Sequence, residues 1–469
     1  MKDLKNSQLS TVHSPLKPGY KQTEVGVIPE DWNVCELNSF AKVTSGKRLP
    51  LGRSLTENPT PHPYIRVKDM TQGSIIQSDL MYVPEDTFPQ IKRYCIFKDD
   101  LFISVAGSLG IVGSVPENLD GANLTENANR IWDIKESQGY LLHVLLSPLI
   151  QNIIQSIQTI GAQPKLALGR IRDFKIPLPP TKAEQAAIAE ALSDADVLIE
   201  SLEQLIAKKC QIKQGAMQAL LTAPPLQMEN GKWIMDNDQS KESAPNSQFS
   251  TIHSPLSRLP GFSGDWEVKT LGEFVTFLKT GTFSRAQLDT DGTIRYLHYG
   301  DIHTSRNIIL KPDQELMPYL PGPLAKLLDR LQDGDLIFAD ASEDREGVGK
   351  SVELSNVGTK TLVSGLHTIA ARFDKAVLAD GYKAYLQFIP DFTSQLGRLA
   401  AGTKVYATTR SHIASIELML PPISEQTAIA EILRDMDEEI ATLETKLTKA
   451  RQIKQGMMQE LLTGRIRLV

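Results

Sequence analysis

The stretch Glu184-Gln-Ala-Ala-Ile-Ala-Glu-Ala-Leu192 returns later in the chain as Glu425-Gln-Thr-Ala-Ile-Ala-Glu-Ile-Leu433. The likeness continues without a gap over residues 184–222 and 425–463, where about 23 of about 39 aligned residues are identical. The two copies lie about 241 positions apart. So close a repeat at so large a distance indicates a duplicated unit.

The spacing of apolar residues predicts that each copy is a long helix. These residues recur at alternating steps of four and three, which places them on one narrow seam. The seam residues are Ile188, Leu192, Ile199, Leu202, Ile206, Ile429, Leu433, Ile440, Leu443 and Leu447. Lys209 interrupts the seam in the first copy. At 1.5 Å per residue each helix would be roughly 57 Å long. Because so narrow a seam needs a partner helix, we expect the two copies to pair antiparallel.

Each long helix follows a segment that predicts a globular domain of mixed α and β structure. Asp31-Trp32 opens the first segment and Asp265-Trp266 opens the second. Short β-rich runs bounded by turn residues follow, and each segment then has a helical patch, near residues 141–157 or 384–399. The predicted fold class is α+β: two mixed globular domains separated by a pair of long antiparallel helices, a coiled coil, as a pseudo-twofold tandem repeat.

These patterns divide the chain into six segments. We expect a leader, a first globular domain, a first spacer helix, a linker, a second globular domain and a second spacer helix, at residues 1–25, 26–175, 176–222, 223–255, 256–417 and 418–469. Framework positions such as Tyr64 and Tyr296, or Asp69 and Asp301, align between the two globular domains, whereas most residues between them do not. The two domains should therefore share a fold but differ in surface.

The overall composition of the 469 residues is that of an ordinary soluble protein. It is 41% hydrophobic and 23% charged, with a net charge of −6. The polar start of the chain and the lack of an apolar run of about 20 residues predict a cytoplasmic location. The net charge argues weakly against nucleic-acid binding. However, each long helix carries about −3, so the rest is near neutral and any basic surface must be local.

No pattern in the sequence predicts a catalytic or metal site. The three cysteines include no Cys-x-x-Cys pair, and the histidines include no His-x-x-x-His pair. Gly347-Val-Gly-Lys-Ser351 resembles the end of a phosphate-binding loop, but Asp344 stands where that loop needs another glycine, so we interpret it as a turn. The chemistry that remains is binding.

Basic and polar residues beside glycine-containing turns are candidates for DNA binding in both domains. Such side chains contact phosphates and present groups to base edges in the major groove. The candidates are Lys47, Arg48, Arg66, Lys68, Lys165, Arg170 and Arg172 in the first domain, and Thr280, Arg285, Lys404, Arg410 and His412 in the second. The alternative for each of them is an ordinary solvated surface residue.

The chain resembles the specificity subunits of type I restriction-modification enzymes. The resemblance rests on the opening Tyr20-Lys-Gln-Thr-Glu-Val-Gly-Val-Ile-Pro-Glu-Asp-Trp32, on a Pro-Leu-Pro-Pro that leads into a Glu-Gln helix, and on a second, divergent copy of the same unit. It covers essentially the whole chain.

The resemblance implies a non-catalytic subunit that recognises DNA. Each globular domain would be a target recognition domain that reads one half of an asymmetric, bipartite site. The paired helices would set the spacing and dock two modification subunits. S-adenosylmethionine for adenine methylation, and the ATP and Mg²⁺ used by restriction subunits, would be bound by those partners. The chain itself would carry no cofactor.

Two questions stay open at this point. A coiled-coil interaction scaffold whose domains do not bind DNA is the alternative function. The element Ser-Thr-x-His-Ser-Pro-Leu, which occurs at residues 10–16 and 250–256, has no functional account.

Overall fold

The computed structural model describes residues 16–158, 165–222, 258–342, 347–358, 361–400 and 406–468, and the backbone of residues 226–229 and 232–235. The chain forms two compact units. Unit 1 comprises Met1–Glu203 and Thr445–Val469, and unit 2 comprises Gln204–Glu444. Each unit therefore contains one globular part and a portion of both long helices.

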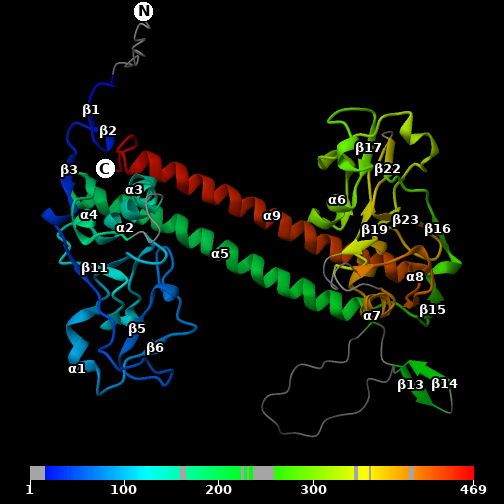
Figure 1. Cartoon of the computed structure of the whole chain (residues 1–469), viewed down its shortest axis with the longest axis horizontal. Coiled ribbons are helices and arrows are strands. Elements are labelled where there is room, and N and C mark those ends of the chain that lie inside the picture. The colour runs from blue at the N-terminus through cyan, green and yellow to red at the C-terminus, as the bar shows by residue number, and fades with distance from the viewer. Residues whose placement is uncertain are drawn as a thin grey trace, which may run out of the picture. The chain divides into compact units, whose positions relative to one another are not determined.

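The two predicted long helices are α5 (Lys182–Leu221) and α9 (Ile423–Leu461), of 40 and 39 residues. In each unit they lie side by side and antiparallel (Figure 1). Their ion pairs show this direction, since residues further along α5 contact residues that come earlier in α9. Their ion pairs are Asp196–Lys454 and Glu203–Arg451 in unit 1, and Lys209–Glu439 and Lys213–Asp437 in unit 2.

The ion pairs also carry the pseudo-twofold symmetry of the repeat. A shift of about 241 positions converts the pair Asp196–Lys454 into the pair Asp437–Lys213. Lys209, which interrupts the predicted seam, has its ammonium 2.7 Å from Glu439. The interruption is thus a charged contact between the helices.

The two predicted spacer segments, 176–222 and 418–469, do not begin as helices, which corrects their boundaries. Residues at their starts belong to β12 (Lys175–Leu178) and β25 (Glu417–Leu420), which pair antiparallel with β3 (Asn33–Glu36) and β15 (Glu267–Thr270). The prolines that follow these strands cannot donate a helical backbone hydrogen bond, so the helices begin only after them.

A buried glutamine ties the first turn of each long helix to its globular part. The Gln185 side-chain oxygen accepts the Ser137 N–H at 2.9 Å, and the Gln426 oxygen accepts the Ala379 N–H at 2.9 Å. The Gln426 amide also donates to Pro421 and Val377 carbonyls, at 2.9 and 3.0 Å. These bonds give the repeated glutamine a structural role.

The glutamate beside each glutamine is also buried and accepts an arginine. Arg467 contacts both Glu184 and Asp31 and lies over the Trp32 ring at 5.8 Å. Its hydrogen bonds to Glu184 are the main cause of a raised Arg467 pKa. In unit 2, Arg258 makes the corresponding bond to Glu425, at 2.6 Å. One arginine comes from the last residues and the other from the segment after the linker.

Unit 1 is built from small sheets and short helices. Its four-stranded sheets have the orders β4-β11-β8-β9 and β6-β5-β10-β7, and β1 pairs with β2. The strand bounds are β1 Tyr20–Thr23, β2 Gly26–Pro29, β4 Lys42–Ser45, β5 Pro63–Ile65, β6 Met81–Tyr82, β7 Cys95–Ile96, β8 Leu101–Ser104, β9 Val112–Ser114, β10 Ala122–Leu124 and β11 Ala128–Trp132. The helices are α1 Phe88–Ile91, α2 Gln138–Leu146, α3 Pro148–Gln158 and α4 Leu168–Arg172.

Unit 2 repeats this plan with a five-stranded sheet. Its order is β16-β23-β19-β21-β18, and β17 pairs with β22 and β20 with β24. The strand bounds are β16 Val275–Phe277, β17 Ile294–Leu297, β18 Ile309–Leu310, β19 Leu336–Ala339, β20 Ala341–Ser342, β21 Ser351–Leu354, β22 Thr361–Ser364, β23 Thr368–Phe373 and β24 Tyr406–Ala407. The helices are α6 Tyr299–Thr304, α7 Pro390–Leu399 and α8 Arg410–Ala414.

The helical patch predicted near residues 141–157 is two helices, α2 and α3, because Ser147-Pro148 breaks it. Of the described helices, none alone is long and apolar enough to span a membrane. Only α2 and α3 taken together, bent by 51°, reach that length and composition. Tyr140, Val144 and Ile150 of this pair lie in the apolar core of unit 1.

The linker predicted at 223–255 is not wholly irregular. Its described backbone forms a hairpin of β13 (Leu226–Glu229) and β14 (Lys232–Met235). The apolar run Trp233-Ile-Met235 in this segment falls on β14. The repeated Ser-Thr-x-His-Ser-Pro-Leu element, apart from Leu16, lies outside the described residues.

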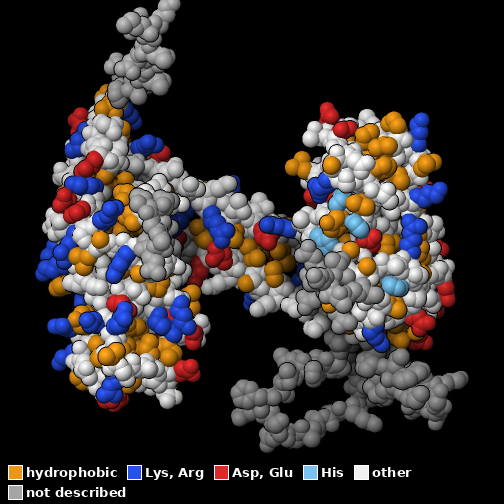
Figure 2. Space-filling model, viewed as in Figure 1, with side chains coloured by type: hydrophobic (Ala, Val, Ile, Leu, Met, Phe, Trp, Pro, Cys, Tyr) orange, Lys and Arg blue, Asp and Glu red, His pale blue; other side chains and the backbone are white. Residues whose placement is uncertain are grey.

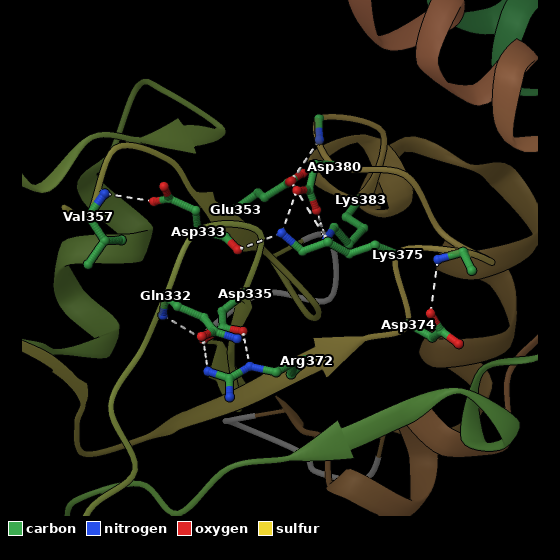
Figure 3. Close-up of polar contacts among 12 residues, drawn as sticks. Gln332, Asp333, Asp335, Glu353, Val357, Arg372, Asp374, Lys375, Asp380 and Lys383 are labelled. Atoms are coloured by element: carbon green, nitrogen blue, oxygen red, sulfur yellow. Dashed lines mark hydrogen bonds and ion pairs between the residues drawn. The ribbon is translucent and has the colours of Figure 1, made fainter.

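A buried aspartate–arginine pair braces the central sheet of each unit. Arg372 of β23 contacts Asp335, which precedes β19, at 2.8 and 2.7 Å (Figure 3). Arg130 of β11 contacts Asp100 in the same way, at 2.5 and 3.2 Å. Burial raises the pKa of Asp100, and the hydrogen bonds to Asp335 raise the pKa of Arg372. The same brace therefore occurs in both units.

Candidate nucleic-acid interface

Loops at the strand ends of unit 1 form one continuous polar surface. Backbone hydrogen bonds join them: the Lys47 N–H donates to Leu124 at 2.8 Å, the Thr125 N–H to Ile65 at 3.1 Å, and the Leu166 N–H to Val105 at 3.0 Å. We call this surface the loop face of unit 1 and define it as residues 45–48, 66–69, 105–109, 125–127 and 165–172. It contains all seven candidates of the first domain. Five of them lie in the adjoining loops and turns, and Arg170 and Arg172 lie on α4.

Three candidate cations of this face are engaged by acidic neighbours. Arg48 lies 3.0 Å from Glu126 but keeps a side chain that is 75% exposed. Lys68 lies 2.6 Å from Asp79, which lowers the pKa of that aspartate. Arg66 is more tightly held, because Asp69 accepts its guanidinium and its backbone N–H, each at 2.8 Å. Arg66 therefore stabilises its own turn.

The remaining cations of the face are not paired with acidic side chains of described residues. Lys47, Lys165 and Arg170 are exposed, and none of them forms an ion pair with a described residue. Arg172 donates to the Val43 carbonyl at 3.0 Å, which fastens α4 to β4. Lys47, Lys165 and Arg170 are thus the side chains of this face with charge to offer a phosphate.

Unit 2 has a corresponding surface, the loop face of unit 2, which we define as residues 280–285, 298–303, 340–342, 365–367 and 408–412. The Gly281 N–H donates to Ser364 at 2.8 Å and the Thr408 N–H donates to Asp340 at 2.8 Å, so these loops adjoin as in unit 1. A Cβ on Gly281 would lie 2.9 Å from the Tyr296 ring, which explains the glycine in this turn.

The candidates of the second domain are less uniform. Arg285 lies 2.5 Å from Asp301 and is 58% exposed. Arg410 is exposed and donates to the Leu278 carbonyl at 2.7 Å, and Thr280 is half-buried. His412 is half-buried, and its Nδ1 has no partner among the described residues. Lys404 lies outside the described residues.

A cluster of aromatic rings, which the sequence patterns do not single out, distinguishes the loop face of unit 2. Tyr299 lies among three imidazoles, with ring centroids 4.5 Å from His298, 6.0 Å from His303 and 5.5 Å from His367. Figure 2 shows pale blue histidine side chains gathered around α6 in this unit. Burial, followed by the charge of Arg285, lowers the pKa of His298, which favours the neutral ring.

A signal for this cluster was present in the sequence. Asp69 and Asp301 align, and both accept the N–H of the residue three positions before them: Arg66 at 2.8 Å and His298 at 2.9 Å. The next residue, Val67 or Tyr299, therefore occupies the same place in both units. The difference between Val67 and Tyr299 at this aligned turn is the sequence signal for the cluster.

The predicted seam residues are buried or half-buried in both helices, and none is exposed. Ile188 and Leu192 belong to the core of unit 1, whereas Ile429 and Leu433 belong to the core of unit 2. The first turns of each helix thus pack into a globular part. Among the described residues, no group of three or more His, Cys, Asp or Glu side chains is placed to bind a metal ion.

The fold defines a class of protein with two α+β domains in tandem, an antiparallel pair of long helices, and one polar loop face on each domain. The type I restriction modification DNA specificity domain family matches residues 29–209 and 377–452, which is more than half of the chain. The chain belongs to this family. The predicted family and fold class are therefore confirmed.

Known proteins resemble the chain over nearly its full length. The type I restriction enzyme MjaVIII specificity subunit of Methanocaldococcus jannaschii is 24% identical over 455 residues, which cover 94% of each chain. The type I restriction enzyme EcoKI specificity subunit of Escherichia coli strain K12 is 23% identical over 464 residues, covering 94% of this chain and 90% of the other.

A solved structure agrees on the fold. The crystal structure of the S subunit of a type I restriction-modification system from M. genitalium has a TM-score of 0.54 and 14% identity, and the match covers 92% of this chain and 96% of that chain. At this identity the likeness concerns the fold alone.

Proposed function

We propose that the chain is the non-catalytic, sequence-specific DNA-recognition subunit of a type I restriction-modification complex. The family membership supports this proposal, and one structural observation carries it: the same framework presents two loop faces of different chemistry. Unit 1 offers exposed cations, such as Lys47 and Lys165, whereas unit 2 offers the rings around Tyr299. Two unlike faces suit two unlike half-sites, and therefore an asymmetric, bipartite target.

The partners in this proposal are double-stranded DNA, two modification subunits and restriction subunits. S-adenosylmethionine, ATP and Mg²⁺ would bind to those subunits and not to this chain, and the complex would act in the cytoplasm. The adenine methyltransferase and ATP-dependent endonuclease activities would then belong to the assembly.

The long helices supply a surface for the modification subunits. Ile212 and Ile453 are related by the repeat and are 46% and 52% exposed. An exposed apolar residue at the same position of both copies suits two identical partners, one for each copy. Val197 and Leu198, also exposed, have the charged counterparts Glu438 and Glu439 and are not shared in this way.

DNA binding by the complex assembled with modification subunits tests the proposal. We expect a mobility shift on duplexes that contain the target site, identified by mapping methylated adenines in a host that carries the system. Affinity should fall about 100-fold or more between 50 and 200 mM salt, because phosphate contacts release counterions. A complex that assembles fully yet binds no duplex at low salt would instead support the interaction scaffold.

A further inference from the structure

We propose that Tyr299 is a specificity-determining residue of unit 2, whose hydroxyl group contacts a base edge of one half-site while the three surrounding imidazoles fix its ring. The proposal rests on the proposed function and deepens it, because it assigns to one side chain a role in choosing the bases. The ligand is a base edge in the major groove of a DNA duplex.

The ring of Tyr299 is fixed from several directions. The His303 and His367 rings stand nearly perpendicular to it, at 81° and 85°, and the His298 ring is tilted by 42°. Edge-to-face contacts of this kind stabilise a ring beyond the burial of its surface. The rotamer of Tyr299 is therefore restricted before any ligand arrives.

Two of the supporting imidazoles are themselves bound to residues of neighbouring loops. His303 Nε2 lies 3.0 Å from the Ala341 carbonyl oxygen, which requires a proton on Nε2, and Lys350 donates to the His303 carbonyl at 2.7 Å. His367 Nδ1 lies 3.2 Å from the Asp340 carboxylate. Three loops thus converge on one phenol ring.

The backbone of His367 is in the left-handed region, with a φ of 56°. A residue that carries a Cβ is strained in this conformation. The Asp340 N–H donates to the His367 carbonyl at 3.1 Å and holds the conformation. The strain places an exposed imidazole beside the Tyr299 ring.

The hydroxyl of Tyr299 is a polar group that this arrangement leaves for a ligand. Tyr299 is half-buried, and among the described residues its hydroxyl has no hydrogen-bond partner. In contrast, the buried Tyr296 hydroxyl donates to the Phe283 carbonyl and accepts two backbone N–H groups. A phenol hydroxyl both donates and accepts, so it can distinguish base pairs by their donor and acceptor patterns in the major groove.

The residues around Tyr299 include one that can contact the DNA backbone while Tyr299 contacts a base. Arg285 forms an ion pair with Asp301, which lies in the same helix as Tyr299, and its side chain is 58% exposed. It is therefore placed to contact a phosphate. Phosphate contacts position a protein on DNA, whereas base contacts carry the sequence information. At the corresponding turn of unit 1, the exposed polar side chain is the Lys68 ammonium paired with Asp79.

The test compares base preferences of assembled complexes that carry Tyr299→Phe or, as a matched control, Tyr319→Phe. Tyr319 is a half-buried tyrosine of unit 2 outside its loop face. Each complex binds a duplex library in which both half-sites are randomised one base pair at a time, and the bound fraction is sequenced. The unfolding midpoints of both variants should equal that of the unchanged complex.

We expect Tyr299→Phe to reduce discrimination about 5- to 10-fold at one or two base pairs of a single half-site. The other half-site and the Tyr319→Phe complex should keep the original preferences. Preferences for Tyr299→Phe that match the unchanged complex at every base pair would overturn the inference. If the unchanged complex itself has no preference, the proposed function fails instead, which separates the two failures.

Discussion

Glu353 is a buried acid whose environment in unit 2 makes it sensitive to pH. Its two carboxylate oxygens accept the Gly381 and Ala384 N–H groups at 2.7 and 2.9 Å, and the buried Lys383 ammonium lies 3.9 Å away (Figure 3). Burial is the dominant influence and raises the pKa of Glu353 to about 7. The nearby positive charge offsets only part of this effect.

The expected consequence is a loss of stability as pH rises. The folded pKa exceeds the ordinary value of 4.5, so the folded state binds the proton more tightly than the unfolded state. This contribution to stability is fully present below about pH 4.5, falls as pH rises from there through 7, and amounts to roughly 3 kcal/mol in total. Thermal unfolding of the protein at pH 5, 6, 7 and 8 should record this fall.

Glu353→Gln should remove this pH dependence. The amide cannot ionise, although its NH₂ group faces a backbone N–H and lowers stability at every pH by about 1–3 kcal/mol. The slope between pH 5 and 8 is therefore the quantity to compare. If the variant loses stability with pH as steeply as the unchanged protein, another group is responsible.

Unit 1 has no such pair at the corresponding place. Ser114 takes the place of Glu353, because it pairs with Leu101 as Glu353 pairs with Leu336. Leu141 takes the place of Lys383, because each lies four residues after the backbone N–H that the buried glutamine accepts. Sequence alignment of the framework could not reveal the pair, since the two partners lie 30 positions apart in a region where the domains diverge.

The seam of the long helices supports a prediction at the scale of elements. Leu192 is fully buried in the core of unit 1, whereas Val197, five residues further along α5, is 62% exposed. Leu192→Asp would bury an unpaired carboxylate and should cost at least 3 kcal/mol. Val197→Asp should change the free energy of unfolding by no more than about 0.5 kcal/mol. Denaturant unfolding of both variants provides the comparison, and equal effects would contradict the seam.

The glutamine at the start of α9 supports a second prediction at this scale. Gln426→Glu preserves shape but replaces two donated hydrogen bonds by a carboxylate facing the Pro421 and Val377 carbonyls. We expect a loss of about 2–5 kcal/mol at pH 8. Gln452→Glu, at an exposed position of the same helix, is the matched control and should have little effect. A harmless Gln426→Glu would mean that this anchor is dispensable.

Periodicity predicted the elements that obey local rules, and missed those set by long-range contacts. The alternation of four and three identified both helices, and the proline pairs marked the region where they begin. Steps of apolar residues cannot tell packing against a partner helix from packing against a core, so Ile188 and Leu192 gave no sign that they join unit 1. The ring cluster around Tyr299 could not be predicted, because loops far apart in sequence assemble it. The sequence also does not indicate that the Arg66 guanidinium is bound to Asp69.

The repeated surface of the helices predicts how partners dock on the whole molecule. Ile212→Glu and Ile453→Glu should each remove one modification subunit, and the double variant should remove both, because a charge in the buried centre of an interface is costly. The mass of the assembled complex in solution records the number of subunits. Leu198→Glu is the control, because it introduces the residue that the second copy already has at this position, Glu439. A surface that binds a partner on both copies must tolerate glutamate there.

Exchange of a whole domain tests the division of labour between the units. Replacement of residues 26–175 by the same segment of a relative should change one half of the methylated site and leave the other half unaltered. Methylated adenines mapped across a genome give both halves in one measurement. Altered bases in both halves would contradict independent reading by the two loop faces.

The way the two units divide the chain has a consequence for synthesis on the ribosome. Unit 2 is one continuous stretch, Gln204–Glu444, whereas unit 1 needs Thr445–Val469 in addition to its first 203 residues. Arg467, the counter-charge of the buried Glu184, emerges only after the whole of unit 2. Unit 1 therefore begins to emerge before unit 2 but is completed after it. Until then its Glu184 carboxylate lacks an arginine partner, whereas Glu425 already receives Arg258.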